Sequence, residues 1–321
     1  MTCSEGMLLR QEARTLGPAA ARALAVPGTS LRVHSIFAGT LNLEAEAGDS
    51  LVTLMGPSGS IYPHTVALAQ PVDFRAWRLR PGCHALLQAG ILSLHGEDVT
   101  VEVDLGGAEQ AALRPLPRLV QLGTAHPFCV VRLAELQGRQ GCELRMDSQH
   151  RPGVETAGMS GRLRRAALDL GQAAHEILHP PGRVGDPLDR TLPDGVAVHP
   201  TLARAVAALV GLGPGLTPAG DDFLCGFLAA AHAGAPDLVP ALAAAVEANL
   251  HRTCRISGLL VRCAVRGFWP SPLVDLAQAL AAKQVPEALV ALVEMGEMGH
   301  SSGLDLATGF LFGLEALLLE A

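Results

Sequence analysis

The chain has 321 residues, of which 49 % are hydrophobic, 17 % are charged and only 3 % are aromatic. Its formal charge of −7 argues against a nucleic-acid partner, because a protein that neutralises phosphates needs a basic surface. This length is enough for a large core and for two domains. With so few aromatic residues, alanine, leucine, valine and glycine must fill that core, which favours closely packed helices.

The sequence carries no signal for secretion or for a membrane. Its first residues, MTCSEGMLLRQEAR, include Glu5 and lack an apolar signal core. The most apolar runs are interrupted by His232, Asp305 or Glu315, and they are shorter than the roughly 18 to 20 residues that span a bilayer. The seven cysteines form no CxxC pair, which is typical of reduced thiols. We therefore expect a cytoplasmic protein without a membrane partner.

Strand patterns dominate the N-terminal half. The stretch EARTLGPAAARALA predicts a short N-terminal helix, interrupted at Gly17 and Pro18. Residues 98–105 then alternate strictly between apolar and polar side chains, which predicts a half-buried strand. Further strands are expected at residues 31–37, 40–46, 50–55, 64–69 and 91–94. The hairpin spacing predicts an antiparallel β domain, a sandwich or a barrel, over residues 1–150.

The C-terminal half, residues 151–321, has a helical pattern. Residues 159–178 predict one helix, and a connector rich in proline, glycine and aspartate follows at residues 180–193. From Pro200 onward, proline recurs at the first position of each expected helix and glycine follows the helix ends. The fold class is therefore α+β, with an N-terminal antiparallel β domain followed by a helical bundle.

Two stretches of the helical half share one pattern. Residues 211–228, GLGPGLTPAGDDFLCGFL, join a glycine-punctuated loop to a helix start, and G-x-D-x-x-x-G-F-L recurs without a gap at residues 303–311. The repeat matches Asp222 with Asp305, and each lies four residues before a glycine on the same helix face. Either two helices pack through small residues, or both helix starts face one site and bring the two carboxylates within roughly 10 Å.

The starts of the two helices could supply donors to an anion. Thr217 before Pro218 and Ser302 before Asp305 fit N-cap signals. Free backbone amides are expected at a capped helix start, and glycine lets a ligand approach the backbone closely. The candidate binding residues are Gly213, Gly215, Thr217, Gly220, Asp221, Ser301, Ser302 and Gly303. Asp221 either takes part in this site or faces solvent.

Other polar residues add candidates around these helix starts. His300 precedes the second helix start and could transfer a proton near neutral pH, or simply bond its own backbone. Arg255, Arg262 and Arg266 share one helix face and form either a solvated stripe or a clamp for a carboxylate or phosphate. We take Asp222, Asp305 and His300 as the candidate catalytic residues, and Arg255 as a substrate-binding residue.

The blocks GLGPGLTPAGDDFLCG and GHSSGLDLATGFLFG resemble the signature blocks of a bacterial family of unknown function. One branch of that family is the AllH-like subunit of the oxalurate (oxamate) carbamoyltransferase of anaerobic allantoin breakdown, a part of purine catabolism. The resemblance extends to HSIFAGTLNLEAEAGDSLVTL, GPSGSIYPHTVAL and RISGLLVRCAVRGFW. Family members more often carry threonines ahead of the middle block, where this chain has Thr253, Cys254 and Arg255.

The resemblance implies carbamoyl transfer among oxalurate, oxamate and carbamoyl phosphate, together with other carbamoyltransferase subunits as partners. Under this interpretation, helix-start amides bind the small anionic substrate, and Asp222 and Asp305 hold a metal ion, with Mg²⁺ the candidate, or orient a cationic partner. No cofactor is required by the sequence. The alternative is a small-anion-binding protein without catalysis.

A third function class comes from the string HExxH at residues 175–179, which is typical of zinc metallopeptidases. His179 precedes Pro180, which disfavours helical geometry at His179, and the longer motif's third ligand position is Gly185. We therefore assign no metal ligands there and predict that His175 and His179 do not bind zinc.

Overall fold

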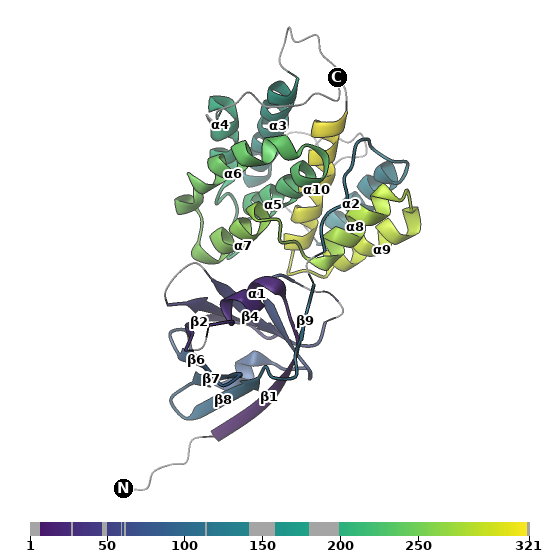
Figure 1. The fold of residues 1–321 in the computed structure, drawn as a ribbon. Helices are drawn as coiled ribbons and strands as arrows, with labels where there is room; N and C mark the ends of the chain where they lie inside the picture. The colour runs from purple at the N-terminus through teal and green to yellow at the C-terminus, as the bar shows by residue number, and fades with distance from the viewer. Residues whose placement is uncertain are drawn as a thin grey trace, which may run out of the picture. The chain divides into compact units, whose positions relative to one another are not determined.

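The computed structural model describes residues 7–26, 28–46, 50–58, 60, 62–112, 114–140, 158–179 and 199–319. Contacts divide the chain into two compact units, Met1–Arg114 and Pro115–Ala321 (Figure 1). The first is built of strands and the second of helices, so the fold is α+β. The predicted domain boundary at residue 150 and the predicted connector at 180–193 lie outside the described residues.

The N-terminal unit is a closed eight-stranded barrel. Its strands follow the order β5-β4-β3-β2-β6-β7-β8-β1, a pairing of β5 with β1 closes the barrel, and the short β9 extends from β1. β1 pairs in parallel with β8, and β4 pairs in parallel with β5, so the sheet is mixed and the expectation of a purely antiparallel domain was wrong. The strands are β1 (Met7–Leu16), β2 (Ser30–Ile36), β3 (Thr40–Ala45), β4 (Leu51–Met55), β5 (Thr65–Leu68), β6 (His84–Gln88), β7 (Ile91–His95), β8 (Val99–Asp104) and β9 (Glu109–Gln110).

Strand β1 corrects the sequence-based expectation of a helix up to Gly17. Its first half pairs with β8 and its second half with β5, with an irregularity between Ala13 and Thr15 where it changes partner. The local sequence favours a helix, but pairing on both edges stabilises the strand, because tertiary context overrides weak propensities. The predicted helix survives only as α1 (Pro18–Ala23), which packs on β4 and β5.

Alternating apolar side chains of strands β3 and β8 fill part of the barrel interior. Val99, Val101 and Val103 of β8 are buried, while Thr100 and Glu102 between them are not. The same period buries Leu41 and Leu43 of β3. In β3 and β8 every second side chain therefore points into the barrel core, as the period of a strand requires. Strand β5 and most of β4 are instead buried at consecutive positions.

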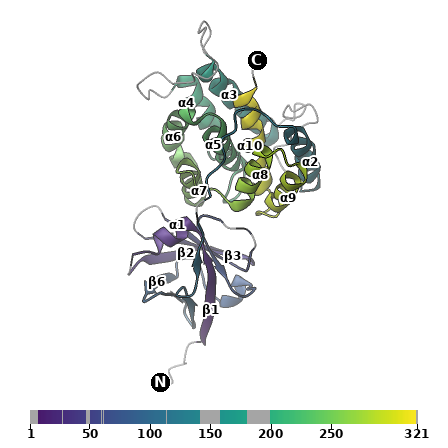
Figure 2. The same cartoon turned by 45° about the vertical axis from the view of Figure 1, so that its right-hand side comes forward.

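The C-terminal unit is helical throughout its described part (Figure 2). Its helices are α2 (Ala125–Gln140), α3 (Met159–Leu178), α4 (Pro200–Leu209), α5 (Ala219–Gly234), α6 (Val239–Glu247), α7 (Arg255–Val265), α8 (Ser271–Ala281), α9 (Val285–Gly296) and α10 (Ser302–Leu318). Helix α2 was not predicted from the sequence. None of the described helices is both long enough and apolar enough to cross a membrane.

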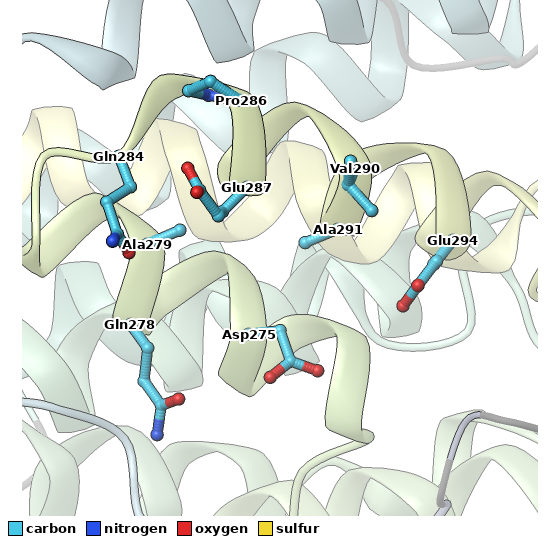
Figure 3. A pocket seen from close by; sticks show the side chains of 9 residues that line it. All are labelled: Asp275, Gln278, Ala279, Gln284, Pro286, Glu287, Val290, Ala291 and Glu294. Atoms are coloured by element: carbon cyan, nitrogen blue, oxygen red, sulfur yellow. The ribbon is translucent and has the colours of Figure 1, made fainter.

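Helices α5 and α10 form the centre of this unit. Nearly every residue of both is buried, and the two make the most extensive contact of any pair of elements. Helices α7, α4 and α6 contact α5, whereas α2, α3 and α9 contact α10. At the periphery, α8 and α9 pack on each other around an open hollow (Figure 3).

Candidate functional site

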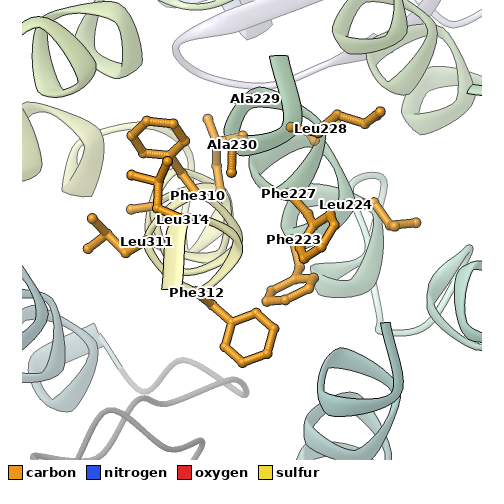
Figure 4. Packing of buried hydrophobic residues seen from close by; sticks show 14 of the residues in the cluster. Phe223, Leu224, Phe227, Leu228, Ala229, Ala230, Phe310, Leu311, Phe312 and Leu314 are labelled. Carbon is orange, nitrogen blue, oxygen red and sulfur yellow. The ribbon is translucent and has the colours of Figure 1, made fainter. Parts of the chain in front are cut away.

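Two glycines bring the backbones of α5 and α10 into direct contact. Figure 4 shows buried side chains of the same two helices, among them Phe223, Phe227 and Phe312. A Cβ on Gly226 would lie 2.0 Å from the carbonyl oxygen of Leu306, and a Cβ on Gly309 would lie 2.0 Å from the carbonyl oxygen of Phe223. No larger residue fits at either position without separating the helices. The small-residue packing that the repeat predicted is therefore confirmed.

The contacts between α5 and α10 keep the register of the sequence repeat. Phe223 and Leu306 are matched in the repeat, as are Gly226 and Gly309. Gly226 of α5 contacts Leu306 of α10, and Gly309 of α10 contacts Phe223 of α5. Further along, Gly313 faces Ala230. Contacts that advance together along both helices mean that the helices run parallel, so their N-terminal ends lie at the same end of the pair.

This arrangement brings Asp222 and Asp305 together, one turn ahead of the contact glycines. Asp305 is fully buried and Asp222 is partly buried, with its Oδ2 atom inaccessible to solvent and without a hydrogen-bond partner. Burial raises the pKa of Asp222 well above its ordinary value, and the neighbouring charge of Asp305 raises it further. The two acids are therefore an interacting pair, and ionising both at once is unfavourable.

Hydroxyl groups connect the two helix starts beside this pair. The Ser302 hydroxyl hydrogen-bonds to the Asp222 carboxyl, which lowers its pKa and partly counteracts burial. The Oγ1 atom of Thr217 lies 2.8 Å from Oγ of Ser302. We predicted Thr217 and Ser302 as helix caps, and this was wrong: Pro218 and Ser301 hold the N-cap positions without a side-chain cap. The hydroxyls bond across the helix pair instead.

Asp221 faces inward and joins three segments. Its Oδ1 accepts from the amide of Gly211 at 2.8 Å, and its Oδ2 accepts from the hydroxyls of Thr253 and of Ser257, the latter at 2.6 Å. Only 1 % of Asp221 is exposed, so the alternative of a solvent-facing acid was wrong. This carboxylate fixes the start of α5 against the start of α7.

Sequence reasoning missed Ser257 and the role of the segment before it. Ser257 lies in the RISGLL block that carries part of the family resemblance, but a lone serine inside a helix gives no signal of its own. The thiol of Cys254 donates to the carbonyl oxygen of Leu216 at 3.0 Å, which ties this segment to the glycine loop as well. Thr253, Cys254 and Ser257 thus support the loop rather than face the acid pair.

The glycine loop ahead of α5 has the backbone geometry that its sequence predicts. Gly211, Gly213 and Gly215 all have positive φ angles, of 74°, 128° and 90°. At Gly211 a Cβ would also lie 2.3 Å from the carbonyl oxygen of Arg252. Within the described part of the chain, no backbone acceptor is found for the amides of Gly213, Gly215 and Thr217. These three amides are among the donors that the loop can offer to a ligand.

The amides of Gly220 and Gly303 are engaged within the protein, contrary to the expectation that they face a ligand. Gly220 donates to Leu212 and Gly303 donates to Met298. A Cβ on Gly303 would lie 1.8 Å from the carbonyl oxygen of Met295. Both positions require glycine because the helix start packs tightly on the preceding backbone.

The remaining candidates lie around these helix starts. His300 is exposed in the turn before α10, and Ser301 follows it as the N-cap residue. Arg255 is exposed at the start of α7. Arg262, on the same helix, forms an ion pair with Glu247 at 3.3 Å. The arginine face is thus at least partly a surface of ion pairs, and only Arg255 lies at the α7 end that Asp221 holds.

The HExxH segment lies apart from these helix starts. His179 has left the helix, with φ −128° and ψ 65°, although its ring still lies 4.5 Å from that of His175. Glu176 accepts a hydrogen bond from Gln172. Among the described residues, no group of three or more histidine, cysteine, aspartate or glutamate side chains is arranged to hold a metal ion.

Cys225, beside Asp222, and Cys263, beside Cys225, are poor nucleophiles. Burial raises the pKa of Cys225 well above its ordinary value, and the charge of Asp222 raises it further. Burial likewise raises the pKa of Cys263 to about 11. Since the thiolate is the reactive form, neither thiol is suited to nucleophilic catalysis.

Comparison with known protein families gives two matches. Residues 209–314 match the family described as oxamate carbamoyltransferase subunit AllH, and residues 11–110 match the AllH family N-terminal domain. Together these ranges cover more than half of the chain. The first contains α5, α7 and α10, and the second spans most of the barrel. No solved structure matches the chain.

Proposed function

The chain belongs to the AllH family, and from this premise we propose that it is a subunit of a carbamoyltransferase acting on oxalurate, oxamate and carbamoyl phosphate. The site proposed for the small anionic substrate is the paired start of α5 and α10. The observation that carries this assignment is the buried, interacting pair of Asp222 and Asp305 beside the free amides of the glycine loop. A packing role alone would not require two acids in the interior.

The reaction sets clear demands on a site. An oxygen of hydrogen phosphate attacks the ureido carbon of oxalurate, and the bond from that carbon to the oxamate nitrogen breaks. One proton passes from phosphate to the departing nitrogen, which gives carbamoyl phosphate and oxamate with the charge balanced. The site must therefore bind two anions, stabilise the oxyanion on the carbon and move one proton.

The helix starts meet these demands in part. Amides of Gly213, Gly215 and Thr217 can donate to a carboxylate, a phosphate or the developing oxyanion. Asp222, whose pKa is raised, holds a proton at a pH where an ordinary carboxyl is ionised, and can give it to the departing nitrogen. Burial and the neighbouring charge of Asp305 keep that pKa high. The exposed His300 is the second candidate for moving the proton.

The carboxylates also select the ligand. A plain anion is repelled by an ionised acid, whereas oxalurate and carbamoyl phosphate each combine an anionic group with N–H donors. We therefore expect the N–H groups to face Asp222 and Asp305 and the anionic end to face the loop amides. A bound Mg²⁺ between acids and anion is the alternative arrangement, and it predicts that ligand binding depends on magnesium.

Calorimetric titration of the purified protein tests this proposal. Oxalurate and carbamoyl phosphate should bind more tightly than phosphate, and Asp222→Ala or Asp305→Ala should weaken their binding. The exposed Asp237, on the surface of the same unit, supplies the matched control, Asp237→Ala. Tighter binding of plain phosphate in both site variants would leave only an ordinary helix-terminus anion site, and the substrate assignment would be wrong.

Turnover separates a catalytic subunit from a binding protein. Carbamoyl phosphate formation should be measured with the isolated chain and again after co-expression with the other subunits of an oxamate carbamoyltransferase. We expect activity only in the assembled enzyme, with loss of activity in Asp222→Asn and no change in Asp237→Asn. Full activity of the assembly with Asp222→Asn would place the chemistry elsewhere.

A further inference from the structure

The open hollow between α8 and α9 is separate from the acid pair. It has a volume of about 460 Å³ and is open to solvent. Figure 3 shows the side chains that line it. The residues that line it are Asp275, Gln278, Ala279, Gln284, Pro286, Glu287, Val290, Ala291 and Glu294. It is therefore a groove along a pair of helices and not an enclosed chamber for a small molecule.

All charged side chains that line the groove are acidic. Asp275 lies on the α8 side, and Glu287 and Glu294 lie along α9, two turns apart (Figure 3). Among the residues that the structure describes, no lysine, arginine or histidine lines the groove. Glu287 and Glu294 are exposed, so both charges are available to a binding partner. The groove thus carries one sign of charge along its length.

The groove also presents apolar surface. Val290 lines the groove between the two glutamates and is 58 % exposed. Ala279 and Ala291 are buried in the floor. Glutamates flanking an exposed valine at helical spacing form a surface complementary to an amphipathic segment with basic residues beside an apolar stripe.

We propose that the α8–α9 groove docks a basic amphipathic helix of a partner protein chain. The proposal rests on the proposed function only in that a subunit has partners. The charge of the groove indicates which partner would bind. A second copy of this chain is disfavoured because its net charge of −7 would be repelled by the acidic groove, whereas lysine or arginine residues of a partner would pair with Glu287 and Glu294. The apolar stripe of the partner would cover Val290.

Fluorescence anisotropy tests the groove with a defined probe. The probe is a labelled peptide of roughly 18 residues, five helical turns, with lysine on one face and leucine on the adjacent face. The comparison ligands are the same peptide with glutamate in place of lysine, and the small polycation spermine as a competitor. We expect the lysine peptide to bind the full chain, the glutamate peptide not to bind, and spermine to compete weakly.

Two double variants of equal charge change locate the binding. Glu287→Lys with Glu294→Lys reverses the groove, while Asp237→Lys with Glu297→Lys reverses two exposed acids that do not line it. The groove variant should weaken the lysine peptide about tenfold or more, and the control less than about threefold. Val290→Ser should weaken the peptide while leaving spermine unchanged.

Three results would overturn the proposal. Equal weakening by both double variants would mean attraction to net charge alone. Spermine competing as strongly as the peptide would indicate a small-cation site. An unchanged affinity in Val290→Ser would remove the apolar contact on which a helical occupant depends. None of these results bears on oxalurate binding at the acid pair, so the two proposals fail independently.

Discussion

The contact between α5 and α10 makes a sharp prediction for Gly226→Ala. The added Cβ would lie 2.0 Å from the carbonyl oxygen of Leu306 and 2.6 Å from the amide nitrogen of Phe310. Both are backbone atoms that cannot rotate away, so the helices must separate by about 1 Å or more. Overpacking of a core costs roughly 1–3 kcal/mol, and a backbone clash belongs at the upper end.

Helix propensity acts in the opposite direction. Alanine is about 1 kcal/mol more favourable than glycine inside a helix. With a clash of about 3 kcal/mol, the net loss in the free energy of unfolding is about 2 kcal/mol. For a unit of this size that corresponds to a melting temperature lower by about 4–8 °C. The matched Gly309→Ala should behave alike, because its Cβ meets the carbonyl oxygen of Phe223 at 2.0 Å.

Thermal and urea unfolding followed by circular dichroism measure this effect. The control is Gly138→Ala in α2, an exposed helical glycine at which a Cβ would meet no atom within 4 Å. It reports propensity alone and should stabilise the protein by up to about 1 kcal/mol. If Gly226→Ala raised the melting temperature as Gly138→Ala does, the direct contact between the backbones of α5 and α10 would be absent, and the predicted loss of stability would be wrong.

The double variant gives a second check. Once Gly226→Ala has separated the helices, Gly309→Ala meets less resistance, because both side chains occupy the same interface. The double variant should therefore lose less stability than the two single variants together. Strict additivity would mean that the two glycines do not share one contact.

Three further predictions concern the buried polar groups and the HExxH segment. Asp221→Ala leaves Thr253, Ser257 and the Gly211 amide without their acceptor, and should lower the free energy of unfolding in urea by roughly 2–4 kcal/mol. A loss below about 1 kcal/mol would mean that these hydrogen bonds do not hold the start of α5 in place. Burial raises the pKa of Glu315 from 4.5 to about 7, so the stability that this carboxyl contributes is full below about pH 4.5 and is lost as pH rises through 7. Glu315→Gln should therefore melt at a higher temperature than the parent at pH 8, and its melting temperature should depend less on pH. An unchanged dependence of the melting temperature on pH would contradict this prediction. Elemental analysis of purified protein should find no stoichiometric zinc, and zinc that disappears in His175→Ala would show that the HExxH prediction is wrong.

Local signals in the sequence were sufficient for much of the fold. Strict alternation placed β8, and proline-led starts placed α4, α8 and α9, because period and capping preferences act within a few residues. The gapless repeat around Asp222 and Asp305 also predicted that two helices pack through glycines. Strand β1 was predicted wrongly, because two distant strands stabilise it and its own composition favours a helix.

The site shows the same division between local and long-range information. The sequence alone determined the family, the positive-φ glycine loop and the matching of Asp222 with Asp305. Only the tertiary structure decided that α5 and α10 run parallel and that Asp221 is a buried acceptor joining three segments. It also decided that Thr217 forms a hydrogen bond with Ser302 instead of capping its helix. Burial, pKa shifts and hydrogen-bond partners depend on which segments meet across the core, and spacing along the chain carries no record of that.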